Sequence, residues 1–309
     1  MFAPVARCWV CGGTTLIPFH QCRLHFQQYA TQDPELHAYS GHRVWLVRCA
    51  ACGFGQPQQL PTLPRFFDRM YDQQWSEDWV ANEFDARYKD FIFRTILGEL
   101  GRRVAPNARR LLDVGAHAGR FMHLARHAGW QAEGIELNPR TAAYAARRTG
   151  GTVHQINADC LQADGRQYSA VTLIDVLEHI PDPLHLLHVL AGLVEPGGCI
   201  AIKVPCGRSQ YFKERVLSMF SHEISLAENL VHVNHFSPRS LRLALERAGF
   251  TKIAVRTGAP ELLQPPVGVV RRTLSNAGRL AVYATASAPG GVHTPLALHL
   301  QAFATKADR

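Results

Sequence analysis

The sequence lacks the segments that would place a chain in or across a membrane. No run of about 18 uncharged apolar residues occurs in its 309 residues, although a membrane-spanning helix needs about 20. The first 20 residues also lack the charged start and apolar centre of a secretory signal. These absences predict a soluble, cytoplasmic protein.

A continuous basic segment is absent as well. The 33 Lys and Arg residues outnumber the 25 Asp and Glu residues, for a formal net charge of +8. The basic pairs at 102–103, 147–148 and 271–272 are nevertheless scattered, which is typical of solvated helix faces. This balance permits an acidic partner such as nucleic acid, a nucleotide-linked substrate or an anionic glycan. The surplus is modest and scattered, so nucleic acid is the least expected of the three. It does not indicate an oligomeric state.

The eight cysteines do not form a disulfide pattern. Four of them fall in two Cys-x-x-Cys pairs, Cys8 with Cys11 and Cys49 with Cys52, and a glycine follows each pair. In a reducing compartment such pairs indicate a metal site. Four thiolates complete a tetrahedral Zn²⁺ site with bonds of about 2.3 Å and no open position, so the ion is expected to be structural.

The 37 residues between the two pairs leave the ligand set open, because they contain Cys22 and four histidines that could each replace a ligand: His20, His25, His37 and His42. Residues 44–47 alternate like a strand that leads into the second pair. We therefore expect a small zinc-ribbon-like module over residues 1–60. The Gln- and Pro-rich stretch 54–64 suits a linker.

The rest of the chain is long enough for a main domain. Aromatic and aliphatic residues recur with helical spacing between 66 and 96, so residues 61–107 are predicted to form a helical linker or cap. Residues 108–309 alternate apolar strands with helical segments, which is typical of an α/β fold.

The most informative segment is 111–119, where a short apolar strand leads through a glycine loop into a helix. Gly115 and Gly119 allow the backbone to approach a ligand or to adopt a positive φ. Asp113 precedes Gly115 by two residues, so the loop is not the dinucleotide fingerprint. An acid at this point favours a cationic ligand, and the ammonium and sulfonium of S-adenosylmethionine fit that requirement.

Acidic residues follow the next predicted strands in order. Strand 131–136 ends in Glu136, whose carboxylate can accept hydrogen bonds from both ribose hydroxyls. Strand 152–156 precedes Asp159, which can accept from an adenine amino group, and strand 170–175 ends in Asp175. Because parallel strands end at the same edge of a sheet, this series predicts one ligand site there.

Over about residues 109–256 the chain resembles the class I S-adenosylmethionine-dependent methyltransferases. The resemblance rests on Asp-Val-Gly-x-x-x-Gly, Ile-Glu, Ala-Asp and Asp-Val-Leu-Glu-His-Ile, and extends to the turn at 195–198 and the segment 235–241. It implies a doubly wound, mostly parallel sheet of about seven strands. In that family the last strand, here 296–305, inserts antiparallel between the strands at 200–204 and 252–256.

The resemblance also implies roles for the acids and glycines. Asp113, Gly115 and Gly119 would hold the methionine portion, Glu136 with Leu137 the ribose, Asp159 with Cys160 the adenine, and Asp175 would line the cofactor through its backbone. Ala116 and His117 stand where many members have a third glycine, so the contacts of these two loop residues depart from the pattern. The family places preceding helices over the cofactor, so Tyr71 or Trp75 could close the pocket, although an aromatic stripe with this spacing is more often part of the core.

Three histidines are candidates for a general base. His179 is the first, because it follows strand 170–175 where the methyl group should point, and imidazole titrates near neutrality. It could instead pack or cap the following helix. His232 and His235 lie in segment 205–236, a predicted substrate lid, although Ser237 and Pro238 could give this segment a purely structural role as a helix start. Residues 258–295 form an insertion with a helical piece at 270–283.

The leading hypothesis is a methyltransferase that acts on a hydroxyl oxygen of a small molecule or sugar, in glycan or secondary-metabolite biosynthesis. Carbon-methyltransferases of nucleotide-linked deoxysugars resemble the chain in their paired-cysteine module, but they usually carry a further C-terminal domain. An RNA methyltransferase is a second alternative, disfavoured because no Asn/Asp-Pro-Pro-Tyr/Phe motif follows strand 170–175. A non-catalytic cofactor-binding module is a third, disfavoured by the intact acids.

Overall fold

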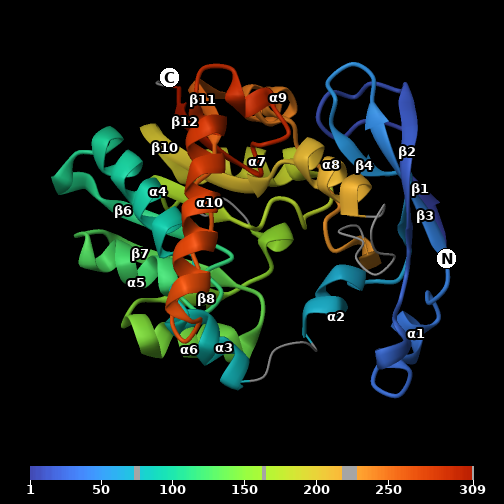
Figure 1. Ribbon diagram of the computed structural model, residues 1–309, viewed down its shortest axis with the longest axis horizontal. Coiled ribbons are helices and arrows are strands. Elements are labelled where there is room, and N and C mark those ends of the chain that lie inside the picture. The colour runs from blue at the N-terminus through green and yellow to red at the C-terminus, as the bar shows by residue number, and fades with distance from the viewer. Residues whose placement is uncertain (73–76, 162–164, 218–227, 308–309) are drawn as a thin grey trace.

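The computed structural model describes residues 1–72, 77–161, 165–217 and 228–307. These residues form one seven-stranded sheet and two small sheets. Figure 1 shows the N-terminal strands stacked beside the large sheet, with helices α2 and α8 on the side that faces them.

The large sheet has the strand order β11-β12-β10-β9-β6-β7-β8. Strands β10, β9, β6, β7 and β8 pair in parallel, and β12 is antiparallel to both of its neighbours, β10 and β11. The predicted fold class and the position of the last strand are therefore confirmed. The strands span Arg110–Val114 (β6), Gln131–Glu136 (β7), Val153–Gln155 (β8), Tyr168–Ile174 (β9), Val194–Pro205 (β10), Phe250–Thr257 (β11) and His299–Lys306 (β12).

Alternate residues of the central strands supply the two faces of the large sheet. Leu112 and Val114 of β6 pack with α7 and α9, whereas Leu111 packs with α4 and α5 on the other face. This two-residue period is what a sheet covered on both faces requires. The helices that surround the sheet span Asp90–Arg103 (α4), Arg120–His127 (α5), Pro139–Thr149 (α6), Pro183–Leu193 (α7), Pro238–Arg247 (α9) and Val269–Ser287 (α10).

Strand β10 is longer than the predicted strand 200–204. Its pairing with β9 shifts in register between Val194 and Cys199. The Glu-Pro-Gly-Gly sequence expected as a turn forms the irregularity, with Gly197 at a positive φ of 73°. A bulge of this kind lets one continuous strand contain a turn-forming sequence.

The N-terminal segment forms two small sheets. Strands β2, β3 and β4 make a three-stranded antiparallel sheet, and β1 pairs with β5. These strands span Phe2–Pro4 (β1), Leu16–Arg23 (β2), Arg43–Cys49 (β3), Gly55–Pro57 (β4) and Gln59–Pro61 (β5). Helices Pro34–His37 (α1), Phe66–Asp72 (α2) and Gly207–Leu217 (α8) lie on this side of the molecule, whereas Glu77–Asp85 (α3) lies beside α6 (Figure 1).

The prediction of a linker at 54–64 is wrong. Strands β4 and β5 lie in this stretch, and all three residues of β4 are buried. Gly55 and His235 exchange backbone hydrogen bonds of 3.0 and 2.9 Å, while Phe54 packs against Phe236 with ring centroids 5.0 Å apart. The apparent linker is therefore a strand that joins the cysteine-containing segment to the large domain.

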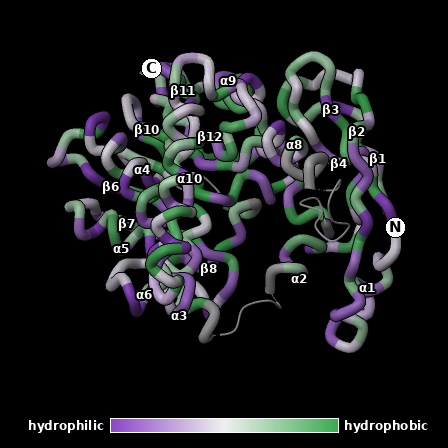
Figure 2. The backbone as a smooth tube through the Cα atoms, in the orientation of Figure 1, coloured by the Kyte–Doolittle hydropathy of each residue, from purple (hydrophilic) through white to green (hydrophobic). Residues whose placement is uncertain are grey.

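Helix α10 extends the predicted helical piece 270–283 at both ends. Only Ala286 of its residues is buried, and it crosses the front of the molecule in Figure 1. Within the described part of the chain, no helix combines the length and apolar character needed to cross a membrane. Figure 2 shows hydrophobic and hydrophilic residues interspersed along the helices and strands.

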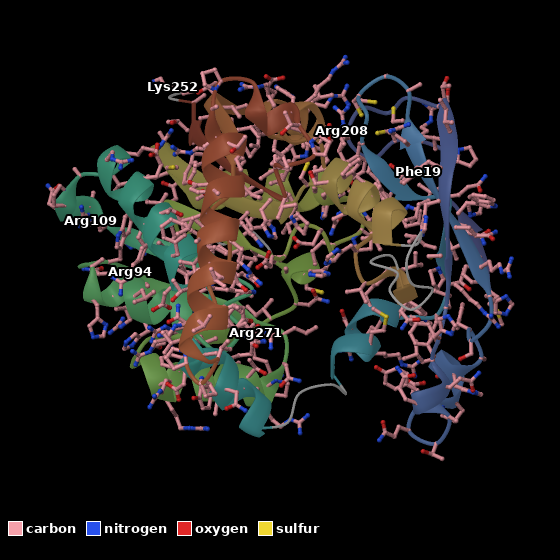
Figure 3. All side chains as sticks on the ribbon, viewed as in Figure 1. Phe19, Arg94, Arg109, Arg208, Lys252 and Arg271 are labelled. Atoms are coloured by element: carbon pink, nitrogen blue, oxygen red, sulfur yellow. The ribbon has the colours of Figure 1, made fainter. Side chains whose placement is uncertain are left out.

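Five basic side chains are labelled in Figure 3. Arg94 and Arg109 lie at the left of the view, Lys252 and Arg208 near the top, and Arg271 lies on α10 in the middle. These five residues therefore do not form a single patch.

Candidate active site

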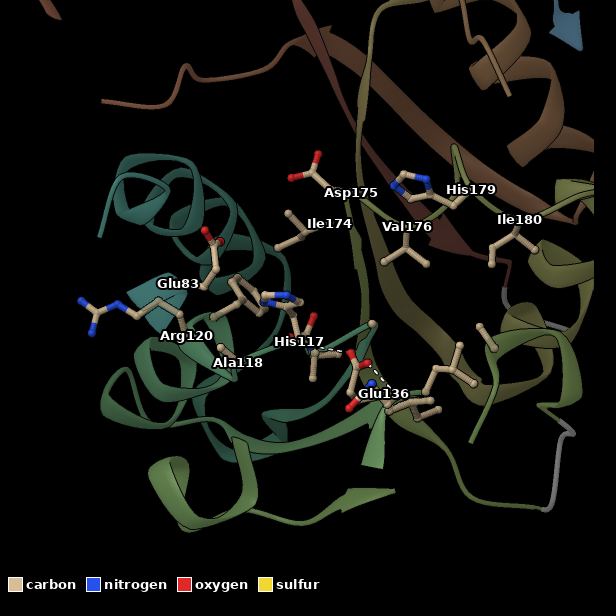
Figure 4. Close-up of a pocket in the computed structure, with 18 of the residues that line it drawn as sticks. Glu83, His117, Ala118, Arg120, Glu136, Ile174, Asp175, Val176, His179 and Ile180 are labelled. Carbon is tan, nitrogen blue, oxygen red and sulfur yellow. Dashed lines mark hydrogen bonds between the residues drawn. The ribbon is translucent and has the colours of Figure 1, made fainter. Parts of the chain in front are cut away.

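A cavity of about 490 Å³ lies beyond the carboxyl ends of β6, β7 and β9. This volume is typical of small-molecule sites. Asp113, the loop after β6, Glu136 and Asp175 form one side, and Phe67 with residues 87–89 contributes from the chain before α4. Figure 4 shows Glu136 at one end of the cavity and Asp175 with His179 at the other.

The glycine loop owes its close packing to two residues with positive φ. A side chain at Gly115 would place its Cβ 2.3 Å from the Cγ2 of Val176, and φ there is +76°. Gly119 has a φ of +82°, and a Cβ there would lie 2.8 Å from Thr149. Glycine is therefore required at both positions by sterics and by backbone conformation. Gly115 lines the cavity with Ala116 and His117, whereas Gly119 is the cap residue that begins α5.

Asp113 is 3% exposed. Its Oδ1 accepts a 2.7 Å hydrogen bond from the Thr172 hydroxyl. Burial, with a smaller contribution from the Glu136 carboxylate, raises the pKa of Asp113 to about 7. No basic side chain of the described residues forms an ion pair with it. The carboxylate form is therefore costly until a donor or cation enters the cavity.

Glu136 ties the glycine loop to the start of α6. Its carboxylate accepts hydrogen bonds from the backbone N–H of His117 at 2.9 Å and of Asn138 at 3.0 Å. Asn138 in turn caps α6, because its Oδ1 accepts from the N–H groups of Arg140 and Thr141. The strand-end acid is thus oriented by two backbone donors while it lines the cavity with Leu137.

Asp175 is paired with two lysines. Its carboxylate contacts the Nζ of Lys203, and the Nζ of Lys89 lies 2.9 Å away. Burial alone would raise the pKa of Asp175, but Lys203 and Lys89 hold it well below its ordinary value. The same ion pair raises the pKa of Lys89 despite its burial. Asp175 also has a positive φ of 58°, in a left-handed region that Asp adopts more readily than most residues.

The turn after β9 brings three titratable side chains together. Glu178, His179 and His232 each offer a ligand atom within 4.8 Å of the others. Only His179 lines the cavity. Burial, with the Asp175 carboxylate, raises the pKa of Glu178 to about 8, and burial lowers the pKa values of His179 and His232.

His235 lies apart from the cavity. It is 4% exposed, and burial lowers its pKa to about 3. A Cβ at Gly55 or at Gly207 would come within 3.0 Å or 2.8 Å of the His235 Cβ, so both glycines make room for it. Its ring packs 5.0 Å from that of Tyr211. The geometry places His235 between the N-terminal segment and the large domain.

Two predicted cofactor residues follow β8. Cys160 is exposed and lines a neighbouring hollow rather than the main cavity. The side chain of Asp159 lies outside the described residues, as do Trp75 and the side chain of Tyr71. Ile156, Asn157 and Ala158 contribute the wall of the cavity at this point.

Several cavity residues were not predicted from the sequence. Lys89, Arg120 and Asn157 carry polar groups into the wall. Arg120 makes a two-bond ion pair with Asp90, at 2.9 and 2.6 Å, and Asn157 donates to Asp68. The only sequence signal for Lys89 was its place directly before an apolar helix.

The four paired cysteines form a cluster. The Sγ atoms of Cys8 and Cys52 are 3.6 Å apart, and those of Cys11 and Cys49 are 3.4 Å apart. A tetrahedral zinc ion with bonds of about 2.3 Å needs sulfurs about 3.8 Å apart. A Cβ at Gly13 would lie 3.3 Å from two of these sulfurs, so glycine lets the backbone follow the cluster closely. The donor set and spacing fit Zn²⁺.

Comparison with known proteins decides the family. A model described as a methyltransferase domain matches residues 84–255, more than half of the chain. The chain belongs to the methyltransferase family. It is an S-adenosylmethionine-dependent methyltransferase, and the cavity at the strand ends is its candidate active site.

Curated relatives of this methyltransferase include ubiquinone biosynthesis O-methyltransferases. The enzyme of Hydrogenovibrio crunogenus is 28% identical over 195 residues, which cover 59% of this chain and 77% of that protein. The enzyme of Methylococcus capsulatus is 35% identical over 99 residues, 30% of this chain and 41% of that protein. Several other matched relatives are also covered over less than half of their length.

Solved structures show the same fold at low identity. Magnesium protoporphyrin IX methyltransferase from Synechocystis, with bound SAH, aligns with a TM-score of 0.50 at 13% identity, over 78% of this chain and 93% of that one. A methyltransferase from Mesorhizobium loti aligns with the same score at 17% identity, over 72% and 100%.

The raised pKa of Asp113 predicts a pH-dependent cost of folding. The carboxyl group ionises near pH 4 in the unfolded chain and near pH 7 in the folded protein. Between these values the folded state binds more protons, so the free energy of unfolding falls as the pH rises. In Asp113→Asn the side-chain oxygen can still accept the hydrogen bond from the Thr172 hydroxyl, but the side chain carries no charge. We expect the ligand-free variant to match the wild type near pH 4 and to be more stable at pH 8, by up to about 4 kcal/mol.

Urea unfolding at both pH values measures this difference. The exposed Asp182→Asn variant serves as the control and should change stability by less than about 0.5 kcal/mol. Equal stability of the wild type and Asp113→Asn at pH 8 would show that the buried carboxylate is compensated in the fold.

Proposed function

We propose that this methyltransferase transfers the methyl group of S-adenosylmethionine to a hydroxyl oxygen of a small-molecule acceptor. The observation that carries the proposal is the composition of the two ends of the cavity. Asp113 and Glu136 line one end, and His179 with the apolar Ile180 and Val231 lines the other. The printed names of the curated relatives, ubiquinone biosynthesis O-methyltransferases, support oxygen as the acceptor atom.

The cofactor end supplies acceptors for hydrogen bonds and for positive charge. The Glu136 carboxylate is already oriented by two backbone donors and is proposed to accept from the ribose hydroxyls. Asp113, whose charge lacks a basic partner among the described side chains, is proposed to face the methionine portion. The positive charge of the ammonium and sulfonium would then favour the ionised form of Asp113.

The acceptor end supplies orientation and a proton acceptor. Methyl transfer is an in-line displacement in which the oxygen attacks the methyl carbon as the carbon–sulfur bond breaks. Positioning and exclusion of water provide much of the acceleration. His179 lines this end, and burial lowers its pKa, so the imidazole is neutral and able to take the hydroxyl proton. His232 and His235 do not line the cavity, and we leave them out of this role.

An acceptor screen tests the proposal. The enzyme is incubated with S-adenosylmethionine labelled in its methyl group and with separate panels of hydroxylated aromatic compounds, nucleotide sugars, glycans and RNA. We expect label in a hydroxylated small molecule and an O-methyl resonance in the product. His179→Ala should lower kcat about 10²- to 10⁴-fold, whereas the exposed His185→Ala should retain wild-type kcat. A C-methylated nucleotide sugar, or label in RNA alone, would contradict the proposal.

We further propose that Cys8, Cys11, Cys49 and Cys52 bind one structural Zn²⁺. Cys8, Cys49 and Cys52 share a hydrophobic core with Leu241 of α9 and the large sheet. Loss of the ion would therefore loosen this shared core as well as the N-terminal strands.

Chelation of the metal is expected to lower the melting temperature of the whole chain in one cooperative transition, because the cluster and the sheet share a core. Calorimetry with and without a zinc chelator measures the change, and mass spectrometry should find one zinc ion per chain. Cys199→Ala, a buried cysteine of β10, controls for cysteine loss by retaining the ion. A metal-free chain with unchanged melting would contradict the structural role.

A further inference from the structure

A second cluster of ligand-type side chains adjoins the acceptor end of the cavity. Glu178, His179 and His232 place one oxygen and two nitrogens within 4.8 Å of one another. The imidazole centroids of His179 and His232 are 4.9 Å apart. The backbone holds the two segments together, because the N–H groups of Val233 and Asn234 donate to the Glu178 carbonyl at 2.9 and 3.0 Å.

The hydrogen bonding of His179 fixes which nitrogen can act as a ligand. Its Nδ1 lies 2.6 Å from the carbonyl oxygen of Val231. A carbonyl can only accept, so Nδ1 carries the proton and the lone pair is on Nε2. Histidines that bind metals are oriented in this way, by donating their other N–H to a carbonyl or carboxylate.

Glu178 supplies an independent observation. The side chain is 1% exposed, and its Oε2 lacks a hydrogen-bond partner among the described residues. A buried carboxyl oxygen without a partner is unfavourable, and a bound cation would satisfy it. The carboxylate of Glu178 belongs to the same cluster as the two imidazoles.

His232 is held by Gln210 of α8, whose amide nitrogen Nε2 lies 3.0 Å from the Nδ1 of His232. In this orientation the amide donates to Nδ1. A half-turn of the amide group exchanges its nitrogen and oxygen, and the carbonyl oxygen would then accept the Nδ1 proton and leave the lone pair on Nε2. With the amide turned, both imidazoles would present Nε2 to one ion.

We propose that Glu178, His179 and His232 bind one divalent transition-metal cation beside the acceptor end of the cavity. Two imidazoles and one carboxylate suit Mn²⁺, Fe²⁺ or Zn²⁺ and leave coordination positions open. Bonds of about 2.1 Å place ligand atoms about 3 Å apart. Small rotations of the three side chains reach this spacing from their positions within 4.8 Å.

The catalytic consequence rests on the proposed O-methyl transfer. An acceptor hydroxyl bound at an open position loses its proton to solvent more readily, because the ion stabilises the resulting oxyanion. That oxygen then forms a bond to the methyl carbon, the carbon–sulfur bond breaks, and its electron pair stays on sulfur in the neutral thioether product. His179 acts through the ion in this scheme rather than as the base itself.

Binding of Mn²⁺ tests the metal site independently of methyltransferase activity. Mn²⁺ prefers oxygen and nitrogen ligands, so zinc should remain on the four cysteines. The zinc-loaded chain is titrated with Mn²⁺, and free Mn²⁺ is followed by electron paramagnetic resonance. We expect one bound Mn²⁺ per chain, bound at least tenfold more weakly by Glu178→Gln and by His232→Ala. The exposed His185→Ala should bind as the wild type does.

Zinc content and S-adenosylmethionine binding of each variant show that it is folded. Absence of stoichiometric Mn²⁺ binding, or binding by Glu178→Gln within twofold of the wild type, overturns the metal site and makes Glu178 a buried neutral acid. Such a result leaves O-methyl transfer with His179 as the base intact. Failure of every hydroxylated acceptor would instead overturn the proposed function while Mn²⁺ binding remained measurable.

Discussion

The burial of carboxylates at one edge of the large sheet is the constraint on which the active site depends. Asp113 and Asp175 lie at the ends of the adjacent strands β6 and β9, yet their pKa values shift in opposite directions. Lys89 and Lys203 compensate the negative charge of Asp175 by forming ion pairs with it. Asp113 accepts a hydrogen bond from the neutral Thr172 hydroxyl instead. Under the proposed function, the cationic part of the cofactor would give Asp113 the compensation that the lysines give Asp175.

The same edge is joined to the N-terminal segment. His235 pairs with Gly55 through the backbone and packs against Tyr211. Three residues earlier, His232 adjoins His179, which lines the cavity. The cysteine cluster shares its core with α9 and the sheet. The region matched by the methyltransferase family begins at residue 84, and the N-terminal segment before it packs against the large domain through Gly55 and His235.

The parts of the fold that depend on local patterns could be predicted from the sequence. The glycine loop, the strand-end acid Glu136 and the paired cysteines each carry their signal within a few residues. Lys89 is 86 residues from Asp175 in the chain, and the Gln- and Pro-rich stretch pairs with residues about 180 positions later. No local pattern contains such partners, and for this reason the ion pairs of Asp175, the strand β4 and the packing role of His235 emerged only from the structure.

Binding of S-adenosylmethionine tests most directly whether the strand-end carboxylates hold the cofactor. Calorimetric titration of the wild type should give one site per chain. Glu136→Gln should bind about 10- to 100-fold more weakly, because hydrogen bonds to a charged acceptor contribute about 1.5–3 kcal/mol, and the exposed Glu246→Gln on α9 should bind normally. Equal affinity of the wild type and a folded Glu136→Gln variant would contradict the account.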